Sequence, residues 1–346
     1  MRYKLLGNSG LRVSELCLGT MTFGTEWGNG ADHPTSRAQF DRFCEAGGNF
    51  IDTANRYTEG TSESFLGDFI QAERDALVLA TKYSLHTQPG DLNNAGNHRK
   101  NLIRSVEGSL ERLRTEYIDL LWVHAWDFTT RAEEVMRALD DLVRQGKVHY
   151  IGVSDTPAWI VSRANMLAEL RGWSQFVGLQ IEYSLLQRTV ERELIPMARH
   201  LDLGVLAWSP LGGGALTGKY LQPATAEETR RLPEDNWKLS KEQRPVVEEV
   251  VKIADEIGCS PAQVALNWVR QQAPVTIPII GARTLEQLED NLQCLEYPLE
   301  DHHLQSLNEV SAIDLGFPME FLKGEHVQNL LFGEQQHKLD IHNRRV

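Results

Sequence analysis

Four residues that can hold or exchange a proton stand at or near the ends of three short apolar segments. Asp52 ends the segment Asn49–Asp52, Lys82 ends Leu77–Lys82, and His124 ends Ile118–His124. Tyr57 follows Asp52 by five positions. Three consecutive apolar segments thus bring an acid, a phenol, an amine and an imidazole. This combination predicts one shared site where protons are transferred.

The set indicates which chemistry this is. A phenol with a pKa of about 10 is a poor acid near neutral pH. A nearby ammonium lowers that pKa by stabilising the phenolate, and a carboxylate keeps the ammonium charged and in place. A histidine can hydrogen-bond a substrate oxygen. We therefore expect Tyr57 to protonate a carbonyl oxygen as general acid, with a cofactor delivering hydride because no nucleophile is in the set.

Short apolar segments of strand type alternate along the chain with longer stretches of helical period, such as Ile103, Val106, Leu110 and Leu113. This alternation predicts parallel strands with helices on the outside, and eight units favour an α/β (β/α)8 TIM barrel over an open doubly wound sheet. The carboxyl ends of barrel strands meet at one rim, which would bring the four residues together. The eight expected strands are Leu16–Thr20, Asn49–Asp52, Leu77–Lys82, Ile118–His124, Val148–Ser154, Phe176–Tyr183, Val205–Ser209 and Thr276–Gly281.

One domain over residues 1–346 is expected, with three additions to the repeat. Residues 1–15 contain Gly7-Asn8-Ser9-Gly10 and predict a β-hairpin that caps one end of the barrel. Leu216–Arg244 is a long polar loop after strand seven, and loops of this length are usually functional. The tail, residues 314–346, carries apolar side chains that either cover an opening or dock as a terminus: Phe317, Phe321, Leu330, Leu331 and Phe332.

Composition narrows the class of protein. The chain has 346 residues and a formal net charge of −13, which argues against nucleic acid or an anionic membrane as a partner. We see no signal-peptide pattern and no apolar run near the ~20 residues of a membrane span. The four cysteines form no CxxC pair and are expected as free thiols in a reducing cytoplasm. His302 and His303 lack further ligands at suitable spacing, so no metal site is expected.

Many ordered motifs make the chain resemble an aldo-keto reductase over nearly its full length. They include LGTMTFG, FIDTANRYTEGTSE, VLATK, LLWVH, GVS, LQIEYSLLQR, WSPLGGGALTGKY and GARTLEQLEDN. The branch that it resembles most is that of the aryl-alcohol-dehydrogenase-like reductases, which are related to potassium-channel β-subunits. The resemblance implies a barrel fold and a catalytic tetrad of Asp52, Tyr57, Lys82 and His124.

The resemblance also implies NADP(H) in an extended form, and no GxGxxG follows a strand here. Thr20 and Met21 would lie beside the ribose and nicotinamide, with Asp52 nearby. Ser154 and Gln180 would hold the carboxamide, and Trp208 would stack on the nicotinamide ring. The pyrophosphate residues would be Ser209, Leu211, Gly213, Gly218 and Lys219. The adenosine residues, at the start of a helix that favours phosphate, would be Gly281, Arg283, Gln287, Asp290 and Asn291.

Two positions depart from the family pattern. Asp155 follows the serine of GVS where many relatives have asparagine, and a carboxylate can accept from the carboxamide but cannot donate to it. Asp290 stands in place of a glutamate that reads the adenine amine and is one methylene shorter.

The substrate is expected to be a small-molecule carbonyl compound, with Trp27, Trp126 and Phe317 as candidate pocket walls. Two other functions stay open. An aldolase would use Lys82 as a Schiff-base amine, which requires a depressed pKa. A redox-sensing regulatory subunit would bind NADPH with little turnover. The sequence leaves the physiological substrate, the strength of the NADPH preference and a homo-oligomeric state undetermined.

Overall fold

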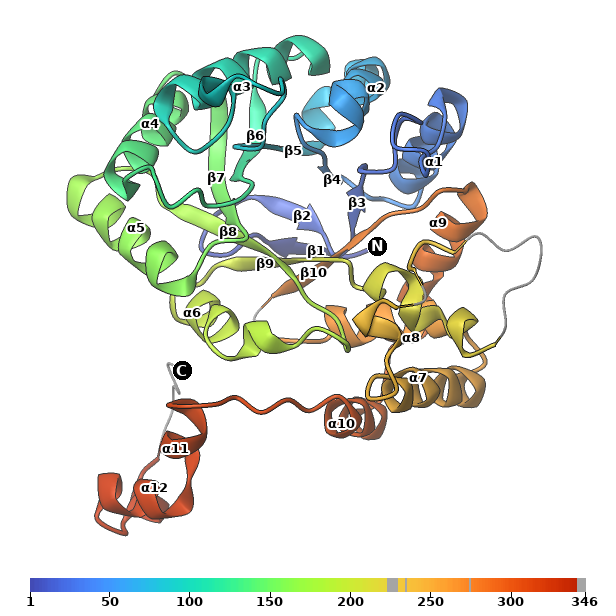
Figure 1. Ribbon diagram of the computed structural model, residues 1–346, viewed down its shortest axis with the longest axis vertical. Coiled ribbons are helices and arrows are strands. Elements are labelled where there is room, and N and C mark those ends of the chain that lie inside the picture. Colours follow the sequence, from blue (N-terminus) through green and yellow to red (C-terminus); the bar gives the residue numbers. More distant parts are fainter. Residues whose placement is uncertain (223–229, 234, 274, 341–346) are drawn as a thin grey trace.

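A closed eight-stranded parallel barrel forms the centre of the protein (Figure 1). The computed structural model describes residues 1–222, 230–233, 235–273 and 275–340. The closed ring confirms the (β/α)8 prediction and excludes the open doubly wound sheet, because the last strand pairs with both the first and the seventh. The barrel strands are β3 (Cys17–Gly19), β4 (Phe50–Asp52), β5 (Val78–Tyr83), β6 (Ile118–Val123), β7 (Val148–Ser154), β8 (Phe176–Glu182), β9 (Gly204–Trp208) and β10 (Thr276–Ile280).

Helices surround this barrel and cover its outer face (Figure 1). In α3, buried Leu102, Val106 and Leu113 share one face, and His98 caps the first turn by accepting from the amide of Asn101 at 3.3 Å. The helices around the barrel are α1 (His33–Glu45), α2 (Thr61–Phe69), α3 (Arg99–Leu113), α4 (Ala132–Arg144), α5 (Ala158–Arg171), α6 (Leu194–His200), α7 (Arg244–Ile257), α8 (Pro261–Arg270), α9 (Leu285–Leu292) and α10 (Asp301–Val310).

A tryptophan fills the inside of the barrel. Trp122 on β6 is fully buried. A Cβ atom added at Gly152 would come within 2.3 Å of its ring, and one at Gly178 within 2.9 Å. The two glycines of β7 and β8 therefore make the space that this side chain occupies.

The predicted N-terminal hairpin is present. Strands β1 (Tyr3–Leu5) and β2 (Arg12–Ser14) pair antiparallel. Leu6 and Val13 are fully buried and pack with barrel residues such as Phe50 and Trp122, so the hairpin closes the end of the barrel opposite to the strands' carboxyl ends.

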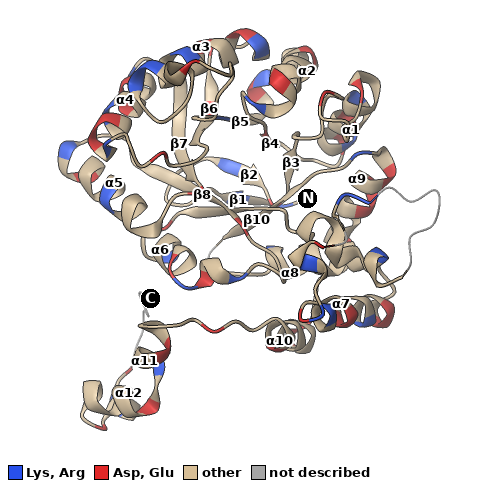
Figure 2. Cartoon of the chain, in the orientation of Figure 1, with Lys and Arg blue, Asp and Glu red and all other residues tan. Residues whose placement is uncertain are grey.

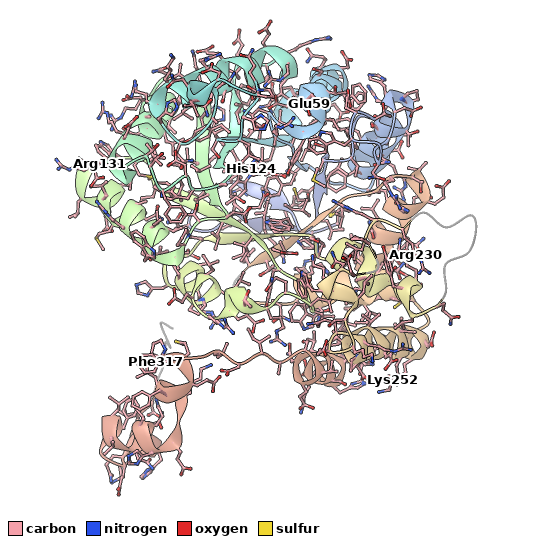
Figure 3. The ribbon with its side chains drawn as sticks, viewed as in Figure 1. Glu59, His124, Arg131, Arg230, Lys252 and Phe317 are labelled. Carbon is pink, nitrogen blue, oxygen red and sulfur yellow. The ribbon has the colours of Figure 1, made fainter. Side chains whose placement is uncertain are left out.

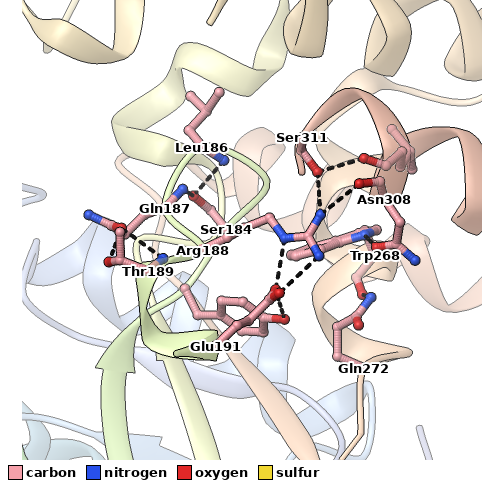
Figure 4. Close-up of polar contacts among 12 residues, drawn as sticks. Ser184, Leu186, Gln187, Arg188, Thr189, Glu191, Trp268, Gln272, Asn308 and Ser311 are labelled. Carbon is pink, nitrogen blue, oxygen red and sulfur yellow. Dashed lines mark hydrogen bonds and ion pairs between the residues drawn. The ribbon is translucent and has the colours of Figure 1, made fainter. Parts of the chain in front are cut away.

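The loop after β8 is fastened to α8 and α10 by the network drawn in Figure 4. Arg188 donates from Nη1 to the Asn308 carbonyl at 3.0 Å and to Ser311 Oγ at 2.8 Å. Its Nε and Nη2 atoms donate to Glu191 at 2.8 and 3.0 Å. Its guanidinium also lies 5.2 Å from the ring centroid of Trp268. One arginine thus holds a rim loop against two outer helices.

The C-terminal tail extends away from the barrel (Figure 1). It holds α11 (Met319–Lys323) and α12 (Glu325–Phe332), and it starts beside the loops after β7 and β8, where Arg192 donates to the Asp314 carbonyl at 2.8 Å. Phe317 is 86% exposed and Leu330 70%. In this arrangement the apolar residues of the tail do not cover the mouth of the barrel.

The predicted long loop Leu216–Arg244 lies only partly within the described residues, since 223–229 and 234 are outside them. On its described part, Lys238 pairs with Glu182 at 2.5 Å. Figure 2 shows acidic and basic side chains interspersed over the outer helices. None of the described helices is long and apolar enough to cross a membrane.

We expect Arg188→Met to destabilise the fold by ~2 kcal/mol or more, because it leaves the mostly buried Glu191 carboxylate without its guanidinium. Urea unfolding would measure this. The control is Arg244→Met, which removes an exposed i,i+4 pair with Glu248 and should cost only ~0.5 kcal/mol. Equal losses in the two variants would contradict the structural role of the network.

Candidate active site

The structure brings Asp52, Lys82, Tyr57 and His124 together at the carboxyl ends of β4, β5 and β6. Asp52 is the last residue of β4, Lys82 the last but one of β5, and His124 follows β6 directly. Lys82 Nζ forms an ion pair with Asp52 Oδ2 and donates to the Thr53 carbonyl at 2.8 Å and to the Tyr57 hydroxyl at 3.0 Å. The ammonium is therefore the centre of the group.

A tight left-handed turn places Tyr57. Thr58 and Glu59 have φ of 46° and 59°, and Gly60 follows with φ of 97°. The Thr58 hydroxyl donates to the Phe23 carbonyl at 2.6 Å, which fixes the turn against the loop after β3. Consecutive residues in this region are strained and persist only where the surroundings hold them. The turn directs the phenol of Tyr57 back toward Lys82, whose Nζ lies 4.6 Å from the ring centroid.

Asp52 and Lys82 are a buried ion pair, with side chains 2% and 1% exposed. Burial raises the pKa of Asp52, and Lys82 together with the amide of Gln180 opposes this change. Burial by itself lowers the pKa of Lys82, but Asp52 and Tyr57 more than offset it, so the net pKa is raised. Lys82 therefore stays protonated at neutral pH, which does not fit an aldolase amine.

The pKa of the Tyr57 phenol differs from the expectation. Burial raises the pKa of Tyr57 above its ordinary value, and the opposing effect of Lys82 is smaller. The expectation of a net lowered pKa is thus wrong for this structure, because loss of solvent outweighs one ammonium. Tyr57 consequently carries its proton at neutral pH, and this is the form that can donate one.

His124 stands across from the phenol. The two ring centroids are 6.0 Å apart at an interplanar angle of 84°. Burial, helped by the charge of Lys82, lowers the pKa of His124 to about 3. Its Nδ1 atom is buried without a hydrogen-bond partner among the described residues. The imidazole is therefore neutral, with polar capacity left over for a bound molecule.

The residues expected at the nicotinamide end lie at or near the carboxyl ends of β3, β7 and β8. Thr20 is fully buried and donates to the Asp52 carbonyl at 3.0 Å, with Met21 next to it. Gln180 Nε2 donates to Asp52 Oδ1 at 2.9 Å. The Ser154 hydroxyl at the end of β7 is buried with no partner in the described part of the chain. An orphaned hydroxyl of this kind fits a group that arrives from outside.

The glycine-rich turn after β9 fits a close backbone approach. Gly212, Gly213 and Gly214 have φ of 60°, 71° and 94°, and Gly218 has 79°. Ser209, directly after β9, also has a positive φ of 53°. The other expected phosphate residues, Leu211 and Lys219, flank the same turn and are partly buried.

The segment after β10 leads into α9, which is capped by Thr284. Gly281 and Gln287 are exposed, and the Gln287 side chain accepts from the backbone amide of Arg283 at 2.9 Å. Asn291 is 4% exposed.

The side chain of Asp290 forms its hydrogen bonds with residues at the start of α8. Its carboxylate accepts from Ser260 Oγ at 3.0 Å and from Gln263 Nε2 at 2.7 Å, where it supports the capped start of α8. The arrangement gives Asp290 a structural task.

The three candidate pocket walls lie at different distances from this centre. Trp27 packs edge-on to Tyr57 at 6.4 Å between centroids, and its Nε1 donates to Glu59 at 3.2 Å. Trp126 is partly buried and packs on the core two residues after His124. Phe317 belongs to the tail, and Figure 3 shows it well away from His124 and Glu59. The structure therefore brings Trp27, but not Phe317, to the tetrad.

Sequence reasoning missed a support behind Lys82. Glu63 is fully buried and accepts from the Thr81 hydroxyl at 2.5 Å and from Arg112 Nε at 2.7 Å. It fixes α2 and α3 against the strand that carries Lys82. The signal that could have found it is a charged side chain on the face of α2 that also carries buried Leu66 and Phe69. Within the described residues, no cluster of three or more His, Cys, Asp or Glu side chains could hold a metal ion. His302 and His303 therefore belong to no such cluster.

We expect the His124 ring signals in NMR spectra to show no titration between about pH 5 and pH 8, because its pKa is lowered to about 3. The spectrum of His124→Gln identifies these signals. An unfolded histidine titrates near ~6.5, so acidification below that value loads protons preferentially onto the unfolded chain and lowers stability. His124→Gln should lose less stability than the wild type over this range. A His124 midpoint between about pH 6 and 7 would contradict the burial argument.

Comparison with known proteins supplies the family. A model of the Aldo/keto reductase family matches residues 15–312. A norsolorinic acid reductase from Emericella nidulans is 41% identical over 325 residues, which cover 91% of this chain and 82% of that protein. An aryl-alcohol dehydrogenase (NADP+) from Phanerodontia chrysosporium is 40% identical over 340 residues, 91% of this chain and 87% of the other. An aldo-keto reductase from Aspergillus calidoustus is 35% identical over 335 residues, 93% and 85% of the two chains. By sequence and by its closed barrel, this chain belongs to the aldo/keto reductase family of oxidoreductases.

Proposed function

We propose that this protein reduces aldehydes or ketones to alcohols with NADPH, and that Tyr57 is the general acid. The observation that carries the proposal is the contact of one buried ammonium, Lys82, with both the Asp52 carboxylate and the Tyr57 hydroxyl, opposite a neutral His124. Family membership and the names of the reductase and dehydrogenase relatives support carbonyl reduction. The printed name of the Phanerodontia relative includes NADP+, which supports the choice of cofactor.

The residues present fit a nicotinamide cofactor. Ser154 offers a buried hydroxyl without a partner, Trp208 a half-buried indole, and residues 212–214 a backbone with positive φ. We assign Ser154 and Gln180 to the carboxamide, Trp208 to the ring, the turn 209–219 to the pyrophosphate and 281–291 to the adenosine. When bound, NADPH supplies hydride to the carbonyl carbon.

The chain's own side chains handle the proton. The neutral His124 ring orients the carbonyl oxygen by a hydrogen bond, and Tyr57 gives its proton to that oxygen as negative charge develops there. Lys82 stabilises the resulting phenolate, and Asp52 holds Lys82 in position and keeps it charged. Tyr57 then takes a proton from solvent to restore the starting state. Trp27, edge-on to Tyr57, forms a wall of the substrate pocket in this proposal.

The competing function is a redox-sensing subunit that binds NADPH and turns over slowly. The two differ in rate, so NADPH oxidation with a panel of aromatic, aliphatic and sugar-derived aldehydes separates them. We also assign the protein to the cytoplasm, because all four cysteines are free thiols, which suits a reducing compartment.

Tyr57→Phe should lower kcat by about 10²–10⁴-fold, since this is the usual contribution of general acid catalysis, while NADPH affinity stays nearly unchanged. The measurement is kcat where chemistry limits turnover, with affinity from fluorescence titration. Tyr117→Phe serves as the control because, among the described residues, its hydroxyl donates to an exposed carboxylate, that of Asp75. A variant at position 57 with more than about a tenth of the wild-type kcat would exclude Tyr57 as the acid.

Arg283→Ala should weaken NADPH binding by about ten- to a hundred-fold and leave NADH binding almost unchanged. A guanidinium at the start of α9 can meet the phosphate on the adenosine ribose with two parallel charged hydrogen bonds, and the helix dipole is favourable there. The net worth of one charged hydrogen bond, ~1.5–3 kcal/mol, corresponds to this loss of affinity. NADH has only a hydroxyl at that point. Isothermal titration with both cofactors tests this, and equal losses, or none, would place the phosphate elsewhere.

A further inference from the structure

Asp155 links the ends of two barrel strands at the mouth. It follows β7 directly and has a φ of 40°, a conformation that aspartate tolerates better than most residues. Its backbone amide donates to the Gln180 carbonyl at 3.3 Å. Its Oδ1 atom accepts from Trp208 Nε1, at the end of β9, at 3.2 Å. The carboxylate is thus held at the edge of the indole assigned to the nicotinamide.

Among the described residues no lysine or arginine forms an ion pair with Asp155, although Lys82 acts on it at longer range. Two other carboxylates stand near it, and each has a lysine: Asp52 pairs with Lys82 and Glu182 with Lys238. For Asp155, within the part of the chain that is described, the side-chain partner is the neutral indole. Asp155 is exposed to solvent in this structure, so a cofactor ring beside the indole would take water away from an unpaired carboxylate, and a positive charge on that ring would compensate for the loss.

The charged and titratable groups facing Asp155 come from three elements. They are Lys82 on β5, Glu182 on β8 and Tyr57 in the turn after β4. Burial raises the pKa of Asp155, while the Trp208 hydrogen bond and Lys82 oppose this. Asp155 also acts on the phenol, since its charge helps to raise the pKa of Tyr57. The carboxylate is therefore close enough to influence the reacting groups.

The geometry points to Asp155 as the residue that discriminates the oxidised from the reduced cofactor. This rests on the proposed function. The nicotinamide ring is a cation in NADP+ and neutral in NADPH, whereas the phosphates are the same in both. A carboxylate beside the ring therefore stabilises NADP+ more than NADPH.

Tighter binding of NADP+ than of NADPH would favour one direction of the reaction, the reduction of the carbonyl compound. Hydride leaves NADPH for the carbonyl carbon, the Tyr57 proton goes to the oxygen, and the products are the alcohol and NADP+. Because Asp155 favours the oxidised form, it shifts the equilibrium on the protein toward the alcohol. It also slows release of NADP+, so product inhibition is the accompanying cost.

The test is Asp155→Asn, which keeps the side-chain shape and an oxygen that can accept from Trp208 but removes the charge. Dissociation constants of NADP+ and NADPH are measured by quenching of tryptophan fluorescence, without substrate. We expect the ratio Kd(NADP+)/Kd(NADPH) to rise by about ten-fold, a size suited to one partly screened charge. Asp155→Glu, which keeps the charge, should restore most of the wild-type ratio.

The pH dependence of the ratio Kd(NADP+)/Kd(NADPH) is a second test. Above the pKa of Asp155 the carboxylate is charged and favours NADP+, so in the wild type the ratio should fall as pH rises through that pKa. In Asp155→Asn the ratio should change little with pH. Ionisation of the ribose phosphate affects both cofactors alike and cancels.

The outcomes are distinct. An unchanged ratio in Asp155→Asn, with both constants shifted equally, would overturn the inference and leave Asp155 as a positioning residue for Trp208. A ratio that rises equally in Asp155→Glu would do the same, because the cause would then be shape. If the wild type bound neither cofactor, the proposed function itself would fail. Wild-type binding and turnover with an unchanged ratio would reject only the role of Asp155.

Discussion

The buried ion pair between Lys82 and Asp52 is the interaction on which the site depends. Both side chains are almost fully removed from solvent, and such a pair is stable only where geometry and further hydrogen bonds compensate for lost hydration. The Thr53 carbonyl, the Tyr57 hydroxyl and the Gln180 amide supply those bonds. Closing the sheet into a barrel makes this possible, because Gln180, 128 residues from Asp52 in sequence, reaches the same carboxylate. The fold and the chemistry therefore share one electrostatic centre.

Around this centre, rigidity comes from elements that do not touch the opening. Glu63 connects α2, α3 and β5 through Thr81 and Arg112. The residues at the rim itself carry the strain, with positive φ at Thr58, Asp155 and Ser209. Strained backbone held by a firm scaffold is typical of sites whose groups must be preorganised.

The sequence was sufficient for the barrel and for the meeting of the tetrad, for a physical reason. Parallel strands buried on both faces appear as continuous apolar segments, so each strand end, and with it Asp52, Lys82 and His124, is visible as the place where the segment stops. The net pKa of Tyr57 was not predictable, because it depends on how much solvent the folded chain removes. The same holds for Asp290, whose hydrogen bonds to Ser260 and Gln263 join the consecutive helices α8 and α9, and for the position of Phe317.

The tryptophan inside the barrel has a consequence for the route by which a proton can reach Tyr57. Trp122 fills the space left by Gly152 and Gly178, and below it Leu6 and Val13 of the hairpin complete an apolar floor. Leu6 and Val13 carry no polar side-chain atom that could pass a proton through this floor. In the proposed reaction we therefore expect Tyr57 to regain its proton from the rim side, the side from which a substrate would enter. A bound carbonyl compound would stop this exchange until the alcohol departs, so that each turnover begins with one proton already stored in the phenol.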